Sequence, residues 1–220
     1  MTDPAPLSTR LRLTLKRLRR DRAGMAAVEF ALTLPVLVGL AMYGGEAANM
    51  AYTSQRLGDL SSITADNVSR IRISITNGGV TDILSGMKVL GDPIDFRNRG
   101  RIIVSSIAPV VDGSGNVTNQ QLRWQRCTGA LNKTSAYGTT EGANIGAAGV
   151  GPTGRKITAS KDSELIFVEI YYTYRPLISA SFFGTPEMSS MAATAVRERN
   201  GTANDILANG ANSPCTTYAA

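Results

Sequence analysis

One carboxylate, Glu29, lies near the start of a long apolar run, and its surroundings require a chemical explanation. The run extends from Met25 to Tyr43 and contains few other polar side chains. It has roughly the 20 apolar residues that a helix needs to cross a bilayer. A charge within such a segment costs roughly 2.5–3.5 kcal/mol near the bilayer centre, so an intramembrane carboxylate is a functional residue by default.

The chemistry open to Glu29 is an ion pair. It lies four residues after Met25, so the two residues share a helix face about one turn apart. If the peptide bond between Gly24 and Met25 is cut, the new amino group of Met25 lies next to this carboxylate. The small residue before the bond favours such processing. The alternative is an ordinary single-pass anchor, in which the N-terminal helix dipole stabilises Glu29 at the membrane edge.

These residues resemble a known processing motif. Gly24, four further residues and Glu29-Phe30 before an apolar helix are similar to the type IV prepilin cleavage motif. More narrowly, Arg-x-Gly-x-x-x-Val-Glu-Phe-Ala-Leu-x-Leu-Pro, ending at Pro35, resembles the TadE-like proteins of Tad (Flp) pilus systems. Phe30 replaces the Tyr usual in major Flp pilins, and those pilins are much shorter. The resemblance therefore implies a minor pilin or pseudopilin.

The resemblance implies partners and a fold. The partners are a prepilin peptidase, which cuts between Gly24 and Met25, and other pilins or pseudopilins of a Tad apparatus. The implied roles are pilus assembly, adhesion or surface attachment, with Glu29 setting the register between subunits. The implied fold is α+β and pilin-like, a long N-terminal transmembrane and amphipathic helix packed on an antiparallel sheet. The alternative function is an unprocessed, single-pass membrane-anchored binding module with an exported head.

Positive charge is concentrated before Gly24. Seven basic and two acidic residues precede it, a net charge of +5, which leaves 16 basic and 15 acidic residues after it. A basic cluster beside a membrane span marks the cytoplasmic flank, so we expect an inner-membrane protein with an exported head and no nucleic-acid partner. A secretory signal peptide cleaved near Ala47 or Ala48 is the competing interpretation. It is less favoured because the apolar run exceeds the usual 7 to 15 residues.

The residue types needed for catalysis are scarce. The sequence has no His, which excludes Ser-His-Asp triads and the common His-based zinc sites. The candidate cation loop is Asp112 to Asn116, where oxygen side chains alternate, but Gly and Asn there favour a simple turn. We therefore expect no enzyme, no cofactor and no metal site.

The two cysteines, Cys127 and Cys215, both follow the predicted span. They would therefore lie on the exported side, where disulfides persist. A bridge between them is the favoured prediction, and two unpaired buried thiols are the alternative, because sequence alone does not determine the Cβ geometry.

The elements that position these residues follow from periodicity. We expect a leader over 1–24, a helix over 25–73 with its membrane span at about 25–45, and an exported head over 74–220. Pro35 lacks an N–H and is expected to kink the span; a helix break at Gly44-Gly45 is the alternative. Apolar spacing predicts a short helix from Val80 to Met87, and β-branched runs predict strands at 101–111, 121–127, 164–175 and 188–199.

Two groups in the head have ambiguous roles. Arg97, Arg99 and Arg101 form a basic run that we expect to lie in a solvated loop. A set of aromatic residues could line a partner groove, although strand alternation directs about half of them into a core. This set consists of Phe167, Tyr171, Tyr172, Tyr174, Phe182 and Phe183.

Overall fold

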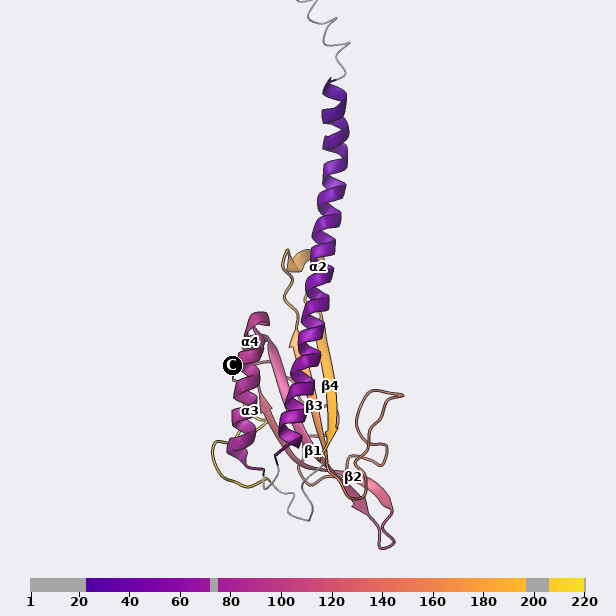
Figure 1. The fold of residues 1–220 in the computed structure, drawn as a ribbon, viewed down its shortest axis with the longest axis vertical. Coiled ribbons are helices and arrows are strands. Elements are labelled where there is room, and N and C mark those ends of the chain that lie inside the picture. Colours follow the sequence, from indigo (N-terminus) through magenta and orange to yellow (C-terminus); the bar gives the residue numbers. More distant parts are fainter. Residues whose placement is uncertain (1–22, 72–74, 197–205, 220) are drawn as a thin grey trace, which may run out of the picture. The chain divides into compact units, whose positions relative to one another are not determined.

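The computed structural model describes residues 23–71, 75–196 and 206–219. The chain divides into two compact units, Met1–Ala48 and Asn49–Ala220. The second unit, which we call the head, contains a four-stranded sheet and the helices that cover it (Figure 1). The α+β fold class is therefore confirmed.

The longest element is helix α2, Ala23–Ser69, with 47 residues. It continues through Pro35 and through Gly44-Gly45, so the alternative of a break at the two glycines is wrong. The helix ends four residues before the predicted position, and residues 72–73 of that prediction lie outside the described part of the chain, as does most of the predicted leader. The kink at Pro35 stays a prediction.

The sheet contains four antiparallel strands in the order β2-β1-β3-β4. They are β1 Gly100–Val111, β2 Val117–Thr128, β3 Leu165–Thr173 and β4 Glu187–Ala195. All four predicted strands are present, although β4 ends at Ala195 and residues 197–199 of that prediction lie outside the described part of the chain. β2 begins earlier than predicted, because the tight turn at 112–116 places Val117 directly opposite Val111. The polar residues after Val117 had concealed this part of the strand.

One face of the sheet packs against helices. The part of α2 after Asn49 and helix α3, Asn77–Leu90, contribute buried side chains to one apolar cluster with alternate strand residues (Figure 1). Thr76 caps α3, since its side chain accepts a hydrogen bond from the Gly79 N–H. The central members of the cluster are Leu57, Leu60, Val68, Val80, Leu84, Ile102, Val104, Trp124, Ile166, Val168 and Ile170.

The opposite face packs against the irregular segment 129–164. Ile107, Leu165 and Phe167 form a second apolar cluster with Val150 and Ala159 from this segment. Because both faces are covered here, four of the six aromatic residues of the predicted set are buried, where about half were expected. These residues are Phe167, Tyr171, Tyr172 and Tyr174.

Three short helices escaped prediction: η1 Asp92–Ile94, α4 Phe96–Arg99 and α5 Ala180–Phe183. Their few residues carry too little periodicity to be recognised. The first two alter the interpretation of the basic run. Arg97 pairs with Asp92 at 2.7 Å and Arg99 with Asp95 at 3.4 Å. Arg101 is not in a solvated loop but is fully buried within β1.

Gly100 supplies a test of packing at the start of β1. Phe96 is fully buried and stacks on Tyr172, and a Cβ on Gly100 would lie 2.4 Å from the Phe96 ring. We expect Gly100→Ala to lower the free energy of unfolding by about 1–3 kcal/mol, as overpacking does. Thermal unfolding of the detergent-solubilised protein, followed by near-UV circular dichroism, measures this.

The matched control is Gly113→Ala in the β1–β2 turn. A Cβ there meets no heavy atom within 4 Å, so its effect should stay within about 0.5 kcal/mol. Equal stability of the Gly100 and Gly113 variants would contradict the packing at Phe96.

Candidate processing and assembly site

The first part of α2 is apolar and exposed on every side. Consecutive residues such as Val36, Leu37 and Val38 are all exposed, so no single face is reserved for a protein core. A helix that is apolar all round requires an apolar environment outside its own domain. Among the described residues, α2 is the helix that is long and apolar enough to cross a membrane.

The predicted processing residues lie together at the start of this helix. Gly24, Met25 and Glu29 are all in α2 and all exposed. Within the described part of the chain, a Cβ on Gly24 would meet no heavy atom within 4 Å beyond its own helix backbone and chain neighbours. From Met25 to Glu29, four residues further along, the helix rises about 6 Å along its axis. An amine created at Met25 would thus lie one turn from the Glu29 carboxylate.

The comparisons with known proteins bear on this segment. Residues 24–66 match a family model described as TadE-like protein. This segment of the chain is similar to the TadE-like proteins. The TadE-like segment begins at the residue before the predicted scissile bond, includes Glu29 and Pro35, and ends three residues before the end of α2. Comparisons with curated proteins and with solved structures give no match.

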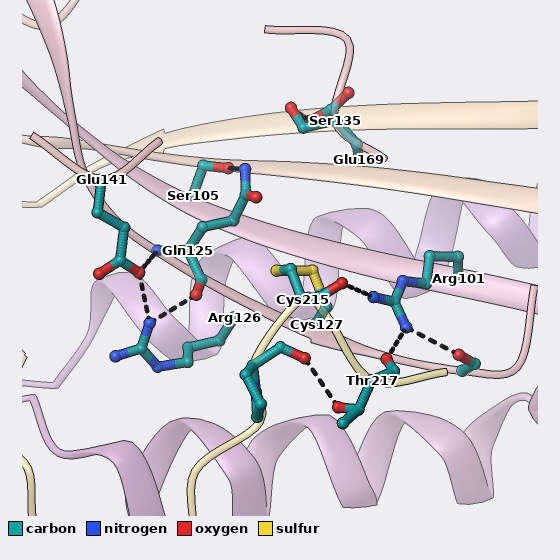
Figure 2. The surroundings of a disulfide bond; sticks show 12 residues. Arg101, Ser105, Gln125, Arg126, Cys127, Ser135, Glu141, Glu169, Cys215 and Thr217 are labelled. Carbon is teal, nitrogen blue, oxygen red and sulfur yellow. Dashed lines mark hydrogen bonds and ion pairs between the residues drawn. A yellow bond between two sulfur atoms is a disulfide. The ribbon is translucent and has the colours of Figure 1, made fainter. Parts of the chain in front are cut away.

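In the head, Cys127 and Cys215 form a disulfide, as predicted (Figure 2). Their Cα atoms lie 4.8 Å apart and the residues are 88 positions apart in sequence. The bridge connects the end of β2 to the C-terminal segment 206–219. The alternative of two free thiols is wrong.

Arg101 holds the same C-terminal segment without a covalent bond. Its guanidinium donates to the carbonyl oxygens of Cys215 at 2.8 Å, Thr217 at 2.7 Å and Gly129 at 3.0 Å (Figure 2). The Tyr218 ring lies 4.3 Å from the guanidinium carbon, in the range of a cation–π contact. Burial lowers the pKa of Arg101, and the carbonyl oxygens compensate for part of the water that the cation has lost.

Backbone bonds extend this attachment to α3. The Asn77 N–H donates to the Leu207 carbonyl at 3.0 Å, and the Cys127 N–H donates to the Ser213 carbonyl at 2.9 Å. Between them, Thr81 Oγ1 donates to the Ala211 carbonyl at 2.9 Å. Segment 206–219 therefore connects the start of α3, the end of β2 and the start of β1.

Glu169 is a buried carboxylate on the sheet face that segment 129–164 covers. Its side chain accepts hydrogen bonds from Ser135 Oγ, from the Ala136 N–H at 3.1 Å and from Tyr171 Oη at 2.8 Å. Figure 2 shows Ser135 from this segment beside Glu169 on β3. Burial raises the pKa of Glu169, and the three hydrogen bonds oppose that shift only in part. Glu169 thus fixes one part of the irregular segment on the sheet.

The Asp112 loop is organised by its own backbone. Asp112 Oδ1 accepts from the Ser114 N–H at 2.9 Å and from the Asn116 N–H at 2.8 Å. The hydrogen bond from the Asn116 backbone is the main cause that lowers the pKa of Asp112. This geometry supports the interpretation as a simple turn.

Arg101 and Glu169 were not recognised as organising residues from the sequence. Arg101 occurs in a local basic run. Two of its three hydrogen-bond partners, Cys215 and Thr217, are more than 100 residues away in the sequence. Glu169 did carry a signal, because it is a lone acidic residue in the apolar strand 165–173. A charge there must find hydrogen-bond partners if both faces are covered.

Glu169 predicts a pH dependence of stability. Its folded pKa is raised above the ordinary value of 4.5, so the folded state holds more protons between these two pKa values. Stability therefore falls as the pH rises through that window and then levels off. We expect the free energy of unfolding to fall with rising pH in the wild type but not in Glu169→Gln. Urea unfolding at a series of pH values from about 4 to about 8 measures this.

Glu187→Gln serves as the control, since Glu187 pairs with Lys133 while half-exposed. It should retain the fall that Glu169 causes. An identical pH profile in wild type and Glu169→Gln would show that Glu169 does not resist ionisation.

Proposed function

We propose that this chain is a minor pilin or pseudopilin of a Tad-type pilus, processed by a prepilin peptidase and active in pilus assembly or surface attachment. The observation that carries the proposal is the TadE-like match over residues 24–66. It coincides with a helix whose apolar side chains are exposed on every side and which contains one carboxylate, Glu29, near its start.

The environment of this helix follows from its surface. Exposed side chains such as Phe30, Leu32 and Leu40 need lipid or the helices of other subunits around them. The basic residues before Gly24 favour a cytoplasmic N-terminus. The head is then exported, a location that suits the disulfide between Cys127 and Cys215.

The proposed role is structural rather than catalytic. The absence of His from the sequence removes the usual general bases and many metal ligands. Among residues 23–71, 75–196 and 206–219, no group of three or more Cys, Asp and Glu residues is arranged to hold a metal ion. The buried polar side chains of the head, such as Arg101 and Glu169, instead bond to the head's own backbone and hydroxyl groups.

The proposed assembly mechanism uses charge in an apolar medium. After cleavage, the Met25 amine is positive and lies one helical turn before Glu29. An unpaired ion among packed apolar helices is strongly disfavoured. Docking of a subunit in the register that pairs an amine with a Glu29 carboxylate, its own or a neighbour's, neutralises both charges. Other registers leave both groups unpaired, so the pair selects the register.

Processing can be tested directly. We expect the membrane-extracted protein to begin at Met25, with 196 residues remaining of 220 after removal of 24. Gly24→Leu should block cleavage, because a bulky residue then precedes the scissile bond. Intact mass and N-terminal sequencing provide the measurement.

Gly39→Leu is the matched control, since Gly39 is also in the apolar part of α2 and also has open space around it. It should be processed normally. A protein that retains Met1 would instead support the unprocessed membrane-anchored binding module, and one that begins beyond Ala47 would support a secretory signal peptide.

The register mechanism predicts the behaviour of Glu29 variants. We expect Glu29→Ala and Glu29→Gln to insert and to be cleaved, yet to reduce incorporation into pili or pilin complexes. Complementation of a null strain, scored by pilus counts and by co-purification with other pilins, measures incorporation.

Thr33→Ala is the control, because Thr33 lies one turn after Glu29 and is likewise exposed. It should assemble as the wild type does. If Glu29 is only an edge residue favoured by the helix dipole, its contribution is about 0.3–1 kcal/mol and assembly changes little. Wild-type pilus counts from Glu29→Ala at normal protein levels would end the register mechanism.

A further inference from the structure

The connection between β3 and β4, residues 174–186, presents apolar side chains to the outside of the head. Phe182 in α5 is 86% exposed and Leu177 is 68% exposed. The segment contains Ile178 as a third exposed apolar side chain. Side chains of this size gathered on one short connection mark an interaction surface.

This connection lies at the end of the head where α2 enters it, at Asn49. Asn49, the first residue of the head, donates from Nδ2 to Tyr174 Oη at 2.6 Å. Twelve residues further along α2, Ser61 hydrogen-bonds to Ser190 of β4 at 2.9 Å. Within the head, α2 therefore runs from the β3–β4 connection along β4. The β1–β2 turn lies at the opposite end of the sheet (Figure 1).

The apolar run of α2 ends only a few residues before this point. From Gly45, the predicted end of the membrane span, to Asn49 the helix rises about 6 Å. The polar headgroup layer on each side of the hydrocarbon core is about 5–8 Å thick. With a span that ends at Gly45, Asn49 therefore lies within the headgroup layer, and the head residue that it bonds to, Tyr174, lies next to it.

The composition of the connection suits that level. It contains one cation, Arg175, and no acidic residue between Arg175 and Pro186. Aromatic and aliphatic side chains beside a basic residue are the composition of segments that bind at the membrane interface. Anionic headgroups can pair with Arg175 while Phe182 and Leu177 enter the acyl boundary.

Several backbone N–H groups of α5 are hydrogen-bonded within the connection itself. The Gly184 N–H donates to the Ala180 carbonyl at 2.8 Å, and the Phe183 N–H donates to the Ser179 carbonyl at 3.2 Å. Ser179 Oγ accepts from the Ser181 N–H at 3.2 Å. Donors that are bonded internally need no water, which lowers the cost of entering lipid.

We propose that the β3–β4 connection is a second membrane contact, in which Phe182 and Leu177 insert into the lipid interface on the exported side. It rests on the membrane anchoring proposed above and adds a second point of attachment. A helix alone leaves the head free to rotate and tilt about its entry point. A second contact at this end restricts both motions and orients the head relative to the membrane surface.

The test places a fluorescent reporter at the tip of the connection. We expect Phe182→Trp, in the full chain reconstituted in nanodiscs of phosphatidylethanolamine and phosphatidylglycerol, to show blue-shifted emission. Lipids brominated near the headgroup end of the acyl chain should quench it. The native Trp124 is buried in the head core, and its emission is subtracted using the wild-type protein.

Two matched variants make the outcome decisive. Ser114→Trp, in the exposed β1–β2 turn at the far end of the sheet, should not be quenched. Leu37→Trp, in the apolar run, should be quenched by deeply brominated lipid.

If Leu37→Trp is unquenched, the membrane anchoring itself fails. If Leu37→Trp is quenched but Phe182→Trp resembles Ser114→Trp, only the second contact is overturned. Protection of Phe182→Trp that appears only when other pilins are added would also overturn it, in favour of a protein partner.

Discussion

The structure depends on one continuous helix, α2, whose first part exposes apolar side chains and whose second part packs against the head. Within α2, the backbone hydrogen bonds are internal throughout, so the helix can remain intact while its side chains change character. Before residue 46 the side chains are mostly apolar and exposed on every side, and after residue 52 only one face is buried. The change of pattern, rather than a break in the backbone, marks the boundary between the two environments.

The head is built so that both faces of its central strands, β1 and β3, are largely buried, while β4 remains partly exposed. Helices cover one face, and segment 129–164 covers the other with little regular structure. An irregular cover must be attached at specific points, because it has no ladder or helix of its own to define its path. Glu169 attaches one part through Ser135 and Ala136, and Gln125 contributes a bond to the Gly138 carbonyl at 3.1 Å. The C-terminal segment is held similarly, by the disulfide and by Arg101.

Elements with a repeating pattern could be predicted, and polar attachments between distant segments could not. The apolar spacing of α2 and α3 and the β-branched runs of the four strands each contain their own signal. The disulfide between the two cysteines could also be predicted, because no third cysteine competes and both follow the predicted span. By contrast, the burial of Arg101 depends on carbonyl groups of residues 129, 215 and 217, and backbone carbonyls leave no trace in a sequence. Similarly, alternation in β3 assumed one exposed face, which segment 129–164 removes.

The position of the disulfide determines how the head bears force. The covalent ring closed by Cys127 and Cys215 includes β3 and β4 but excludes α2, α3 and β1. The backbone joins α2 to this ring only through the C-terminal end of α2 and then α3, β1 and β2, so a pull on the start of α2 first loads the non-covalent packing of the helix. Because α2 runs along β4, from Tyr174 toward Ser190, such a pull acts parallel to the strands and loads the apolar contacts along the helix together. Resistance to tension thus comes from the length of that interface, while the cross-link keeps β3, β4 and the C-terminal segment in one covalent ring should α2 slip.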